Sequence, residues 1–390
     1  MSLIEIEHLD VIFGGEQAKA IQLLDQGMSR QDIIDQSGSV IGVQDANLQV
    51  KKGEICVLMG LSGSGKSSLL RTVNGLNPIS RGSLKIHDDD RIIDLATCDE
   101  KTLRHLRTHR ISMVFQKFAL MPWLSVLDNV AFGLEMKGVS KRERQLKAME
   151  KLEMVGLNEW AASLPHELSG GMQQRVGLAR AFAMDTDILL MDEPFSALDP
   201  LIRAQLQDEL LELQRNLKKT IIFVSHDLDE ALKIGSHIAI MESARIIQHG
   251  EPEQIVLNPE NGYVENFVAH TNPLNVLVGR TLMSSPDQLK TDGDRLILDG
   301  NHNYWIELDQ GKISRAGKAG NLLDTRRWVE GDGERGAFAV ASPDISMRDA
   351  INLRYSSRLP VLLEEGGLFA GVLNDANFYY ALLGKHFVAD

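Results

Sequence analysis

The chain has 390 residues, of which 43% are hydrophobic and 24% are charged, and its formal net charge is -13 at pH 7. That length allows two or three domains, and the negative charge argues against a protein that holds nucleic acid through its phosphates. The two cysteines are too few for a disulfide framework. The N-terminus has no signal-peptide pattern and no apolar run is long enough to span a bilayer, so we expect a soluble, cytoplasmic chain.

The N-terminal part of the chain predicts two strands with a helical insert between them. Residues 3–7 alternate apolar and polar side chains, as a half-buried strand does, and residues 43–50 repeat that pattern. Residues 16–42 lie between them and are interpreted as two short helices. Ser29, three residues before Asp32, is placed to begin the second helix in a capping box.

A glycine-rich segment, residues 60–67, follows an apolar run at 55–59 and precedes a helical pattern. A strand, a glycine-rich turn and a helix in this order form a phosphate-binding loop, in which backbone N–H groups surround the phosphates. Lys66 would reach the β- and γ-phosphates, and Ser67 would bind Mg²⁺. A solvated turn is the alternative. The flanking strand and helix favour a nucleotide site with these contacts: Gly60, Ser62, Gly63, Ser64, Gly65, Lys66, Ser67 and Ser68.

Three more apolar runs lie at residues 111–115, 188–191 and 221–224, and helical patterns separate them. The longest helical region runs from about 125 to 185. Buried strands that alternate with helices predict a parallel sheet with crossover connections. Such sheets bind ligands at the carboxyl ends of their strands. We therefore expect four side chains that follow these strands to meet there: Lys66, Gln116, Glu193 and His226.

Two acidic residues follow the strand at 188–191. Asp192 ends the apolar run and can hold Mg²⁺ opposite Ser67, directly or through water. Glu193 is then free to orient or deprotonate a water in line with the γ-phosphate. A histidine after a strand is usually structural, but its place at this edge favours a role for His226 in the site.

A second pair of glycines follows Ser169 at the start of another helical pattern. Two glycines at a helix start form an anion site, yet the helical region should hold this one far from Lys66. An ordinary helix capped by Ser169 is the alternative.

Together these motifs resemble those of the ATP-binding-cassette (ABC) ATPases, and the resemblance covers residues 3–267. It implies an α/β fold, namely a P-loop NTPase cassette with a RecA-like core, an antiparallel β subdomain and an α-helical subdomain at about 117–185. The family's motifs occur in their usual order: Walker A at 60–67, the Q-loop at Gln116, the signature at 168–175, Walker B at 188–193, the D-loop ending at Asp199 and the switch histidine at His226.

The family resemblance implies a homodimer packed head to tail, with each ATP between one Walker A loop and the other subunit's signature. ATP and Mg²⁺ are the implied cofactors, with Ser67, Gln116 and Asp192 as metal ligands. Phe13 occupies the position of the aromatic residue that stacks on adenine, although an isolated phenylalanine is more often part of a core. The signature residues that would serve the other subunit's γ-phosphate are Ser169, Gly170, Gly171 and Gln173.

The sequence resembles those of the cassettes of quaternary-amine importers, through the insert at 20–42 and the run 53–66. Residues 103–113 and 273–276 look similar to choline uptake members. This implies import of choline or glycine betaine, two transmembrane permease subunits and, indirectly, a solute-binding protein. It places the chain peripherally on the cytoplasmic face of a bacterial inner membrane. A cassette never touches the solute, so these residues cannot identify it.

A second region, residues 271–390, follows the cassette, which is expected to span 1–270. Its pattern of helix, strand, turn, strand and helix is similar to one CBS module, so we expect a smaller, degenerate α+β regulatory domain. Residues 282–318 are a candidate for a decayed first copy. Asn377 stands where nucleotide-binding CBS modules place a ribose-binding aspartate.

Other functions remain open from the sequence. A soluble ABC ATPase of DNA repair or translation would carry long coiled coils or two cassettes per chain, and neither pattern is present. A non-catalytic nucleotide sensor built around the C-terminal region is disfavoured by the intact Glu193 and His226. An importer of another solute is a further alternative, and no nucleic-acid partner is expected.

Overall fold

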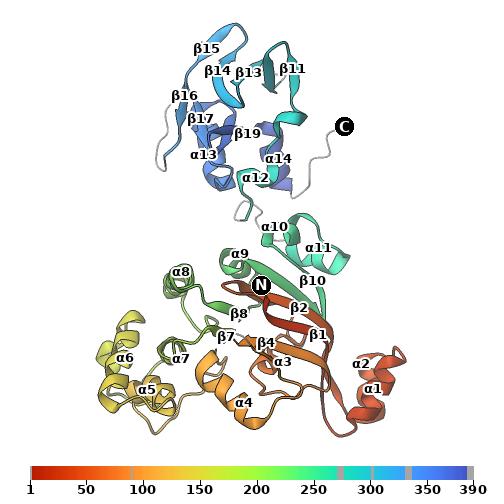
Figure 1. Cartoon of the computed structure of the whole chain (residues 1–390), viewed down its shortest axis with the longest axis vertical. Helices are drawn as coiled ribbons and strands as arrows, with labels where there is room; N and C mark the ends of the chain where they lie inside the picture. The colour runs from red at the N-terminus through yellow and green to blue at the C-terminus, as the bar shows by residue number, and fades with distance from the viewer. Residues whose placement is uncertain (1, 89–90, 270–275, 300–302, 330–335, 384–390) are drawn as a thin grey trace. The chain divides into compact units, whose positions relative to one another are not determined.

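The computed structural model describes residues 2–88, 91–269, 276–299, 303–329 and 336–383 (Figure 1). The chain forms two compact units, 1–251 and 252–390. The second unit begins earlier than the predicted boundary after residue 270, because Leu257 packs in one core cluster with Leu277 and Met347. None of the helices in the described ranges is long and apolar enough to cross a membrane.

The first unit is built around a six-stranded sheet. The four predicted buried strands are confirmed as β3, β6, β7 and β8, which pair in parallel, and β9 extends the parallel set. The strand order is β10-β9-β3-β8-β7-β6. The bounds are β3 (Ile55–Met59), β6 (Ile111–Val114), β7 (Ile188–Asp192), β8 (Thr220–Val224), β9 (His237–Glu242) and β10 (Arg245–Gly250).

A second, antiparallel sheet packs on the first through a shared core. Its strand order is β2-β1-β4-β5, and its bounds are β1 (Ser2–Phe13), β2 (Val40–Lys51), β4 (Arg81–Asp88) and β5 (Arg91–Asp94). Helix α3 (Lys66–Val73) lies between the two sheets: Leu70 of α3 belongs to the same buried cluster as Ile4 of β1 and Leu190 of β7. This burial fixes the start of α3 against both sheets.

The insert forms two helices, as predicted: α1 (Gln17–Asp25) and α2 (Arg30–Ser37). The Ser29 hydroxyl caps α2 by accepting a hydrogen bond from the Asp32 backbone, and Gly38 ends α2 in the left-handed conformation. Both helices pack on the ends of β1 and β2. Their small core combines Leu24 and Ile33 of the insert with Ile12 of β1 and Ile41 of β2.

Helices α5, α6 and α7, which follow β6, lie on the side of the first unit away from α1 and α2 (Figure 1). They confirm the predicted helical region. Helix α6 is buried through Ala148 and Leu152, whereas its Leu146 and Met149 are exposed. The helices of the first unit after α3 are α4 (Glu100–His105), a π-helix at Leu106–Arg110, α5 (Val126–Met136), α6 (Lys141–Met154), α7 (Gly170–Ala183), α8 (Pro200–Leu217) and α9 (Leu228–Ile234).

The second unit begins with helices and an antiparallel sheet. The described part of 282–318 contains strands of this sheet and no α-helix beyond the end of α12, so it differs from the suggested decayed CBS copy. The bounds are α10 (Pro252–Leu257), α11 (Gly262–Val268), α12 (Gly279–Leu282), β11 (Lys290–Asp292), β12 (Arg295–Asp299), β13 (Tyr304–Asp309), β14 (Lys312–Lys318) and β15 (Asn321–Leu323).

The rest of the second unit has the predicted order of helix, strand, turn, strand and helix, which fits a CBS-like domain. Its sheet has the order β16-β17-β18-β19. The left-handed Gly366 and Gly367 form the turn between β18 and β19. The bounds are β16 (Thr325–Arg327), β17 (Phe338–Ala341), α13 (Met347–Ser357), β18 (Val361–Glu365), β19 (Leu368–Leu373) and α14 (Asp375–Leu383).

Asn377 is buried inside this second unit, with only 3% of its surface exposed. Its amide nitrogen donates to the Leu282 carbonyl at 2.6 Å and to the Ser284 hydroxyl at 3.3 Å. Its amide oxygen accepts from the Asn374 backbone N–H at 2.8 Å. The side chain therefore satisfies neighbouring groups of its own unit, and both amide hydrogens are in use.

Candidate active site

The phosphate loop joins β3 to the N-terminus of α3, and two of its glycines are required by geometry. Gly60 has a φ of 140°, and a Cβ there would lie 2.1 Å from the Met241 carbonyl oxygen. Gly65 has a φ of 102°, and its Cβ would lie 2.4 Å from the Gly42 carbonyl oxygen. Side chains at these two places would push the loop off the neighbouring strands, so the loop depends on glycine.

Lys66 lies inside the loop that precedes it. Its Nζ donates to the carbonyl oxygens of Gly60 at 2.8 Å and Leu61 at 2.9 Å. Burial lowers the pKa of the Lys66 ammonium, and the nearby carboxylates of Glu193 and Asp192 oppose that shift. A cation held within a loop at a helix N-terminus makes this end of the site attractive to phosphate.

Asp192 is fully buried at the end of β7. The Ser67 hydroxyl donates to one carboxylate oxygen at 2.7 Å, and an Arg71 Nη donates to the other at 2.9 Å. The hydroxyl and carboxylate oxygens are hard ligands of the kind Mg²⁺ takes when nucleotide phosphates supply the rest. The residues present therefore fit the predicted metal site, with Ser67 and Asp192 already side by side.

Glu193 follows Asp192, and its carboxylate contacts two of the predicted site residues, Gln116 and His226. The Gln116 amide nitrogen donates to a Glu193 carboxylate oxygen at 3.1 Å, and the His226 Nδ1 lies 3.5 Å from the same oxygen. Glu193 also has a φ of 49°, in the left-handed region that non-glycine residues rarely adopt. Such backbone strain collects at functional sites, where it aims a side chain that relaxed geometry would turn elsewhere.

These residues open onto one cavity of about 590 Å³. Ser64 and Asp192 lie beneath its surface, at 5% and 0% exposure. The structure thus gathers the phosphate loop, the Q-loop glutamine and the switch histidine at the predicted strand edge. The predicted residues that line the cavity are Phe13, Ser62, Gly63, Gly65, Lys66, Ser67, Ser68, Gln116, Glu193 and His226.

The signature residues do not line this cavity. Ser169 caps α7 by accepting from the Met172 backbone at 3.3 Å, and Gly170 and Gly171 are at the exposed start of that helix. The Gln173 amide nitrogen donates to the carbonyls that flank the turn before α7, at Pro165 and Leu168. With both amide hydrogens used, Gln173 shapes the turn and leaves Ser169 and the backbone N–H groups as donors.

Asp199, the D-loop aspartate, caps α8 in the same way: its carboxylate accepts from the Ile202 backbone N–H at 3.0 Å.

Gln174 is a residue that sequence analysis missed. Its side chain is buried, and its amide nitrogen donates to the Glu193 carbonyl at 3.1 Å. Its amide oxygen accepts from the Ala197 backbone N–H at 3.1 Å. Gln174 therefore ties the signature helix to both the catalytic strand end and the D-loop. Its neighbour Gln173 is of the same residue type, so only tertiary contacts distinguish the two roles.

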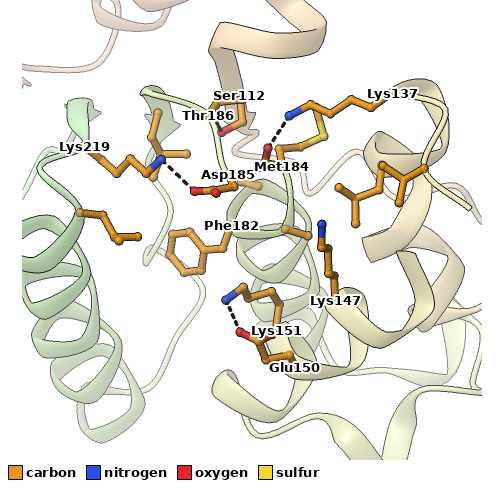
Figure 2. A pocket seen from close by; sticks show the side chains of 16 residues that line it. Ser112, Lys137, Lys147, Glu150, Lys151, Phe182, Met184, Asp185, Thr186 and Lys219 are labelled. Carbon is orange, nitrogen blue, oxygen red and sulfur yellow. Dashed lines mark hydrogen bonds and ion pairs between the residues drawn. The ribbon is translucent and has the colours of Figure 1, made fainter. Parts of the chain in front are cut away.

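A second cavity, of about 460 Å³, lies between α5, α6 and the end of α7 (Figure 2). Four lysines line it, each already has an acceptor, and none of them follows a glycine-rich loop as Lys66 does. The pairs are Lys137 with the Met184 carbonyl at 2.6 Å, Lys219 with Asp185 at 2.8 Å, Lys151 with Glu150 at 2.7 Å and Lys147 with Glu143 at 2.9 Å.

Comparison with known proteins agrees with this site. Residues 43–196 match the family model described as ABC transporter. The chain is 45% identical over 383 residues to the glycine betaine transport ATP-binding protein OpuAA of Bacillus subtilis, which covers 98% of this chain and 88% of that protein. It is 51% identical over 317 residues to the glycine betaine/proline betaine transport system ATP-binding protein ProV of Escherichia coli, covering 79% of this chain and 78% of that protein.

A solved structure shares the fold of the first unit. The bacterial ABC transporter cassette MJ0796, determined as a dimer, matches with a TM-score of 0.55 at 30% identity, covering 64% of this chain and 98% of that chain. The chain belongs to the ABC transporter family and is an ATPase cassette of it. The predicted resemblance to the quaternary-amine branch is confirmed at this level of identity.

The geometry around Glu193 predicts the effect of Glu193→Gln. The substitution keeps the phosphate loop and the Ser67–Asp192 pair, so ATP binding should remain. Hydrolysis should fall by at least about a hundredfold, because the variant lacks the carboxylate that we expect to take a proton from the attacking water. The variant should accumulate as an ATP-bound dimer in size-exclusion chromatography. Glu242→Gln, at the end of β9 on the same sheet edge, is the matched control, and near-normal turnover by Glu193→Gln would contradict the assignment.

Proposed function

We propose that this chain is the ATP-hydrolysing subunit of an importer of quaternary amines, with glycine betaine or choline as the solute. The shared contact of Gln116 and His226 with the Glu193 carboxylate beside the phosphate loop carries the ATPase part of the proposal, and the solute class rests on the relatives. The relatives compared above are named for glycine betaine and proline betaine transport, which favours glycine betaine over choline. Similarity over 98% of this chain disfavours a DNA-repair or translation ATPase.

Each residue then has a defined task in hydrolysis. Bound Mg²⁺ would neutralise charge on the ATP phosphates, with Ser67, Asp192 and Gln116 as its protein ligands. Lys66 would release the Gly60 and Leu61 carbonyls and turn to the β- and γ-phosphates. Glu193 would take a proton from the attacking water. The His226 side chain is 64% exposed, and it would contact the γ-phosphate of the bound ATP.

We propose further that two copies form the complete site. The cavity of one copy lacks the signature residues, whose cap serine and backbone N–H groups lie at the exposed start of α7. A second copy packed head to tail would bring these donors to the γ-phosphate. The Gln174 bridge supports this arrangement, because it lets the position of the signature helix affect Glu193 of the same copy.

The remaining partners would be two permease subunits and, indirectly, a solute-binding protein, with the chain at the cytoplasmic face of a bacterial inner membrane. A largely apolar groove of about 480 Å³ supports permease docking. It is lined by Met121 and Phe132, from the segment after Gln116 and from α5. A permease segment seated there would contact elements directly linked to the Q-loop.

Uptake measurements test the solute. In a bacterial strain without its own uptake of these solutes, the chain, its permease and its binding protein should import labelled glycine betaine. Unlabelled choline and proline should compete more weakly than unlabelled glycine betaine. The Glu193→Gln variant of the same assembly is the control and should import nothing. Stronger competition by choline would reassign the solute, and no uptake of labelled glycine betaine would indicate an importer of another compound.

The composite site predicts a specific behaviour of Ser169→Arg. The bulky cation would block the signature's anion site and leave Lys66 of the same chain untouched. The variant should bind ATP, but it should not form a dimer and should not hydrolyse the bound ATP. Mixed with Lys66→Ala, it should regain partial ATPase activity, because one complete site per pair remains. Ser140→Arg, which alters the cap of α6, is the matched control. Normal dimerisation of Ser169→Arg alone would exclude the head-to-tail arrangement.

The second unit is proposed to regulate transport without binding an adenine nucleotide. The buried Asn377 has no amide hydrogen to spare and supplies no carboxylate for ribose. Calorimetry of the full chain with AMP should therefore detect no binding, while ATP titrated into the same sample should bind at the Lys66 site. Tight AMP binding would contradict this proposal.

Removing residues after 251 should shift the salt dependence of the assembled transporter.

A further inference from the structure

The nucleotide cavity has a second end, away from Lys66, at which Phe13 lies. The ladder between β1 and β2 places Phe13 opposite Val40, and both line the cavity. Val40 is 43% exposed, which is unusual for an apolar side chain in a strand. The Phe13 ring lies against Gly42, where a Cβ would approach it to 2.4 Å. This end therefore offers apolar surface suited to a nucleotide base.

Arg30 is the residue of the two insert helices, α1 and α2, that lines this cavity. One Nη donates to the Ile41 carbonyl at 2.7 Å, immediately beside Val40. Its Nε is buried and has no hydrogen-bond acceptor within the described ranges. No carboxylate of the described residues pairs with it either, whereas Lys19 of the same insert pairs with Glu16. An Nε without exposed surface is out of a ligand's reach, so the remaining Nη is the donor that this cavity-lining side chain can offer to a ligand.

The insert is held firmly enough to position this guanidinium. Its helices share a buried core with Ile12 and Ile41, the neighbours of Phe13 and Val40 along the two strands. Arg81 of β4 adds a second attachment, donating to the buried Asp10 at 2.6 Å and to Asp25 of α1 at 2.7 Å. Arg30 is also the first residue of the capped helix α2. Its place beside the cavity is thus set before any ligand binds.

We propose that Arg30 contacts the base and ribose of the bound nucleotide, and that the insert thereby contributes to the nucleotide site. The guanidinium offers donors in a fixed fork: one Nη holds the Ile41 carbonyl, and the other would face an acceptor on the ligand. A purine ring nitrogen or a ribose hydroxyl is such an acceptor. The phosphates are served by Lys66 and the start of α3 at the other end. This inference rests on the nucleotide site proposed above.

Two ligands separate base recognition from phosphate recognition. Calorimetry on the full chain would measure Mg²⁺–ATP and Mg²⁺–tripolyphosphate, which lacks base and ribose. Arg30→Met should weaken ATP binding about tenfold, the equivalent of ~1.4 kcal/mol, and leave tripolyphosphate binding unchanged. The KM for ATP should rise in parallel. Lys19→Met removes the same charge from the same insert and should alter neither affinity.

Each other outcome has a definite meaning. Equal weakening of both ligands by Arg30→Met would place the contact at the phosphates, and no weakening of either would make Arg30 purely structural; both results overturn the inference. Arg30→Lys, which keeps the charge but loses the fork, should weaken ATP binding selectively and serves if Arg30→Met does not fold. If the unaltered chain bound neither ligand, the nucleotide site itself would be wrong, which is a distinguishable failure.

Discussion

The buried carboxylate of Asp192 is the constraint on which the site depends. A charge at this depth needs partners, and it has the Ser67 hydroxyl and the Arg71 guanidinium, both from α3. The end of β7 and the start of the phosphate-loop helix are thereby held in one arrangement. Because Glu193 comes next on the chain, its position relative to Lys66 follows from the same pairing.

Glu193 in turn connects the nucleotide site to the helical region and to the signature helix α7. In the proposed function these parts transmit ATP hydrolysis to the permease. The Glu193 side chain meets Gln116, which leads into the helical region, and its backbone carbonyl accepts from Gln174 of the signature helix. A strained φ at Glu193 makes its geometry sensitive to both neighbours. Dimer closure at α7 and permease docking beside the Q-loop would therefore both affect the position of Glu193.

The antiparallel sheet and its insert shape the other end of the cavity. The β1–β2 ladder brings Phe13 and Val40 together, and the insert core supports Arg30 beside them. The phosphate end joins the loop and the start of α3 to Gln116, Glu193 and His226, which lie far apart in the chain. The opposite end is assembled from β1, α2 and β2, three elements within residues 2–51, and their packing decides its character.

The sequence by itself determined the phosphate loop, the parallel strands and the order of catalytic residues at their carboxyl edge, because glycine conformations, apolar runs and strand ends are local properties. Tertiary structure alone decided the hydrogen bonds of Gln174 and Arg30, since a side-chain contact with a different element of the fold leaves no local pattern. It also decided which face of α6 is buried and that Leu257 joins the second unit's core. A helical period shows that a helix has an apolar face, but only packing decides what covers that face.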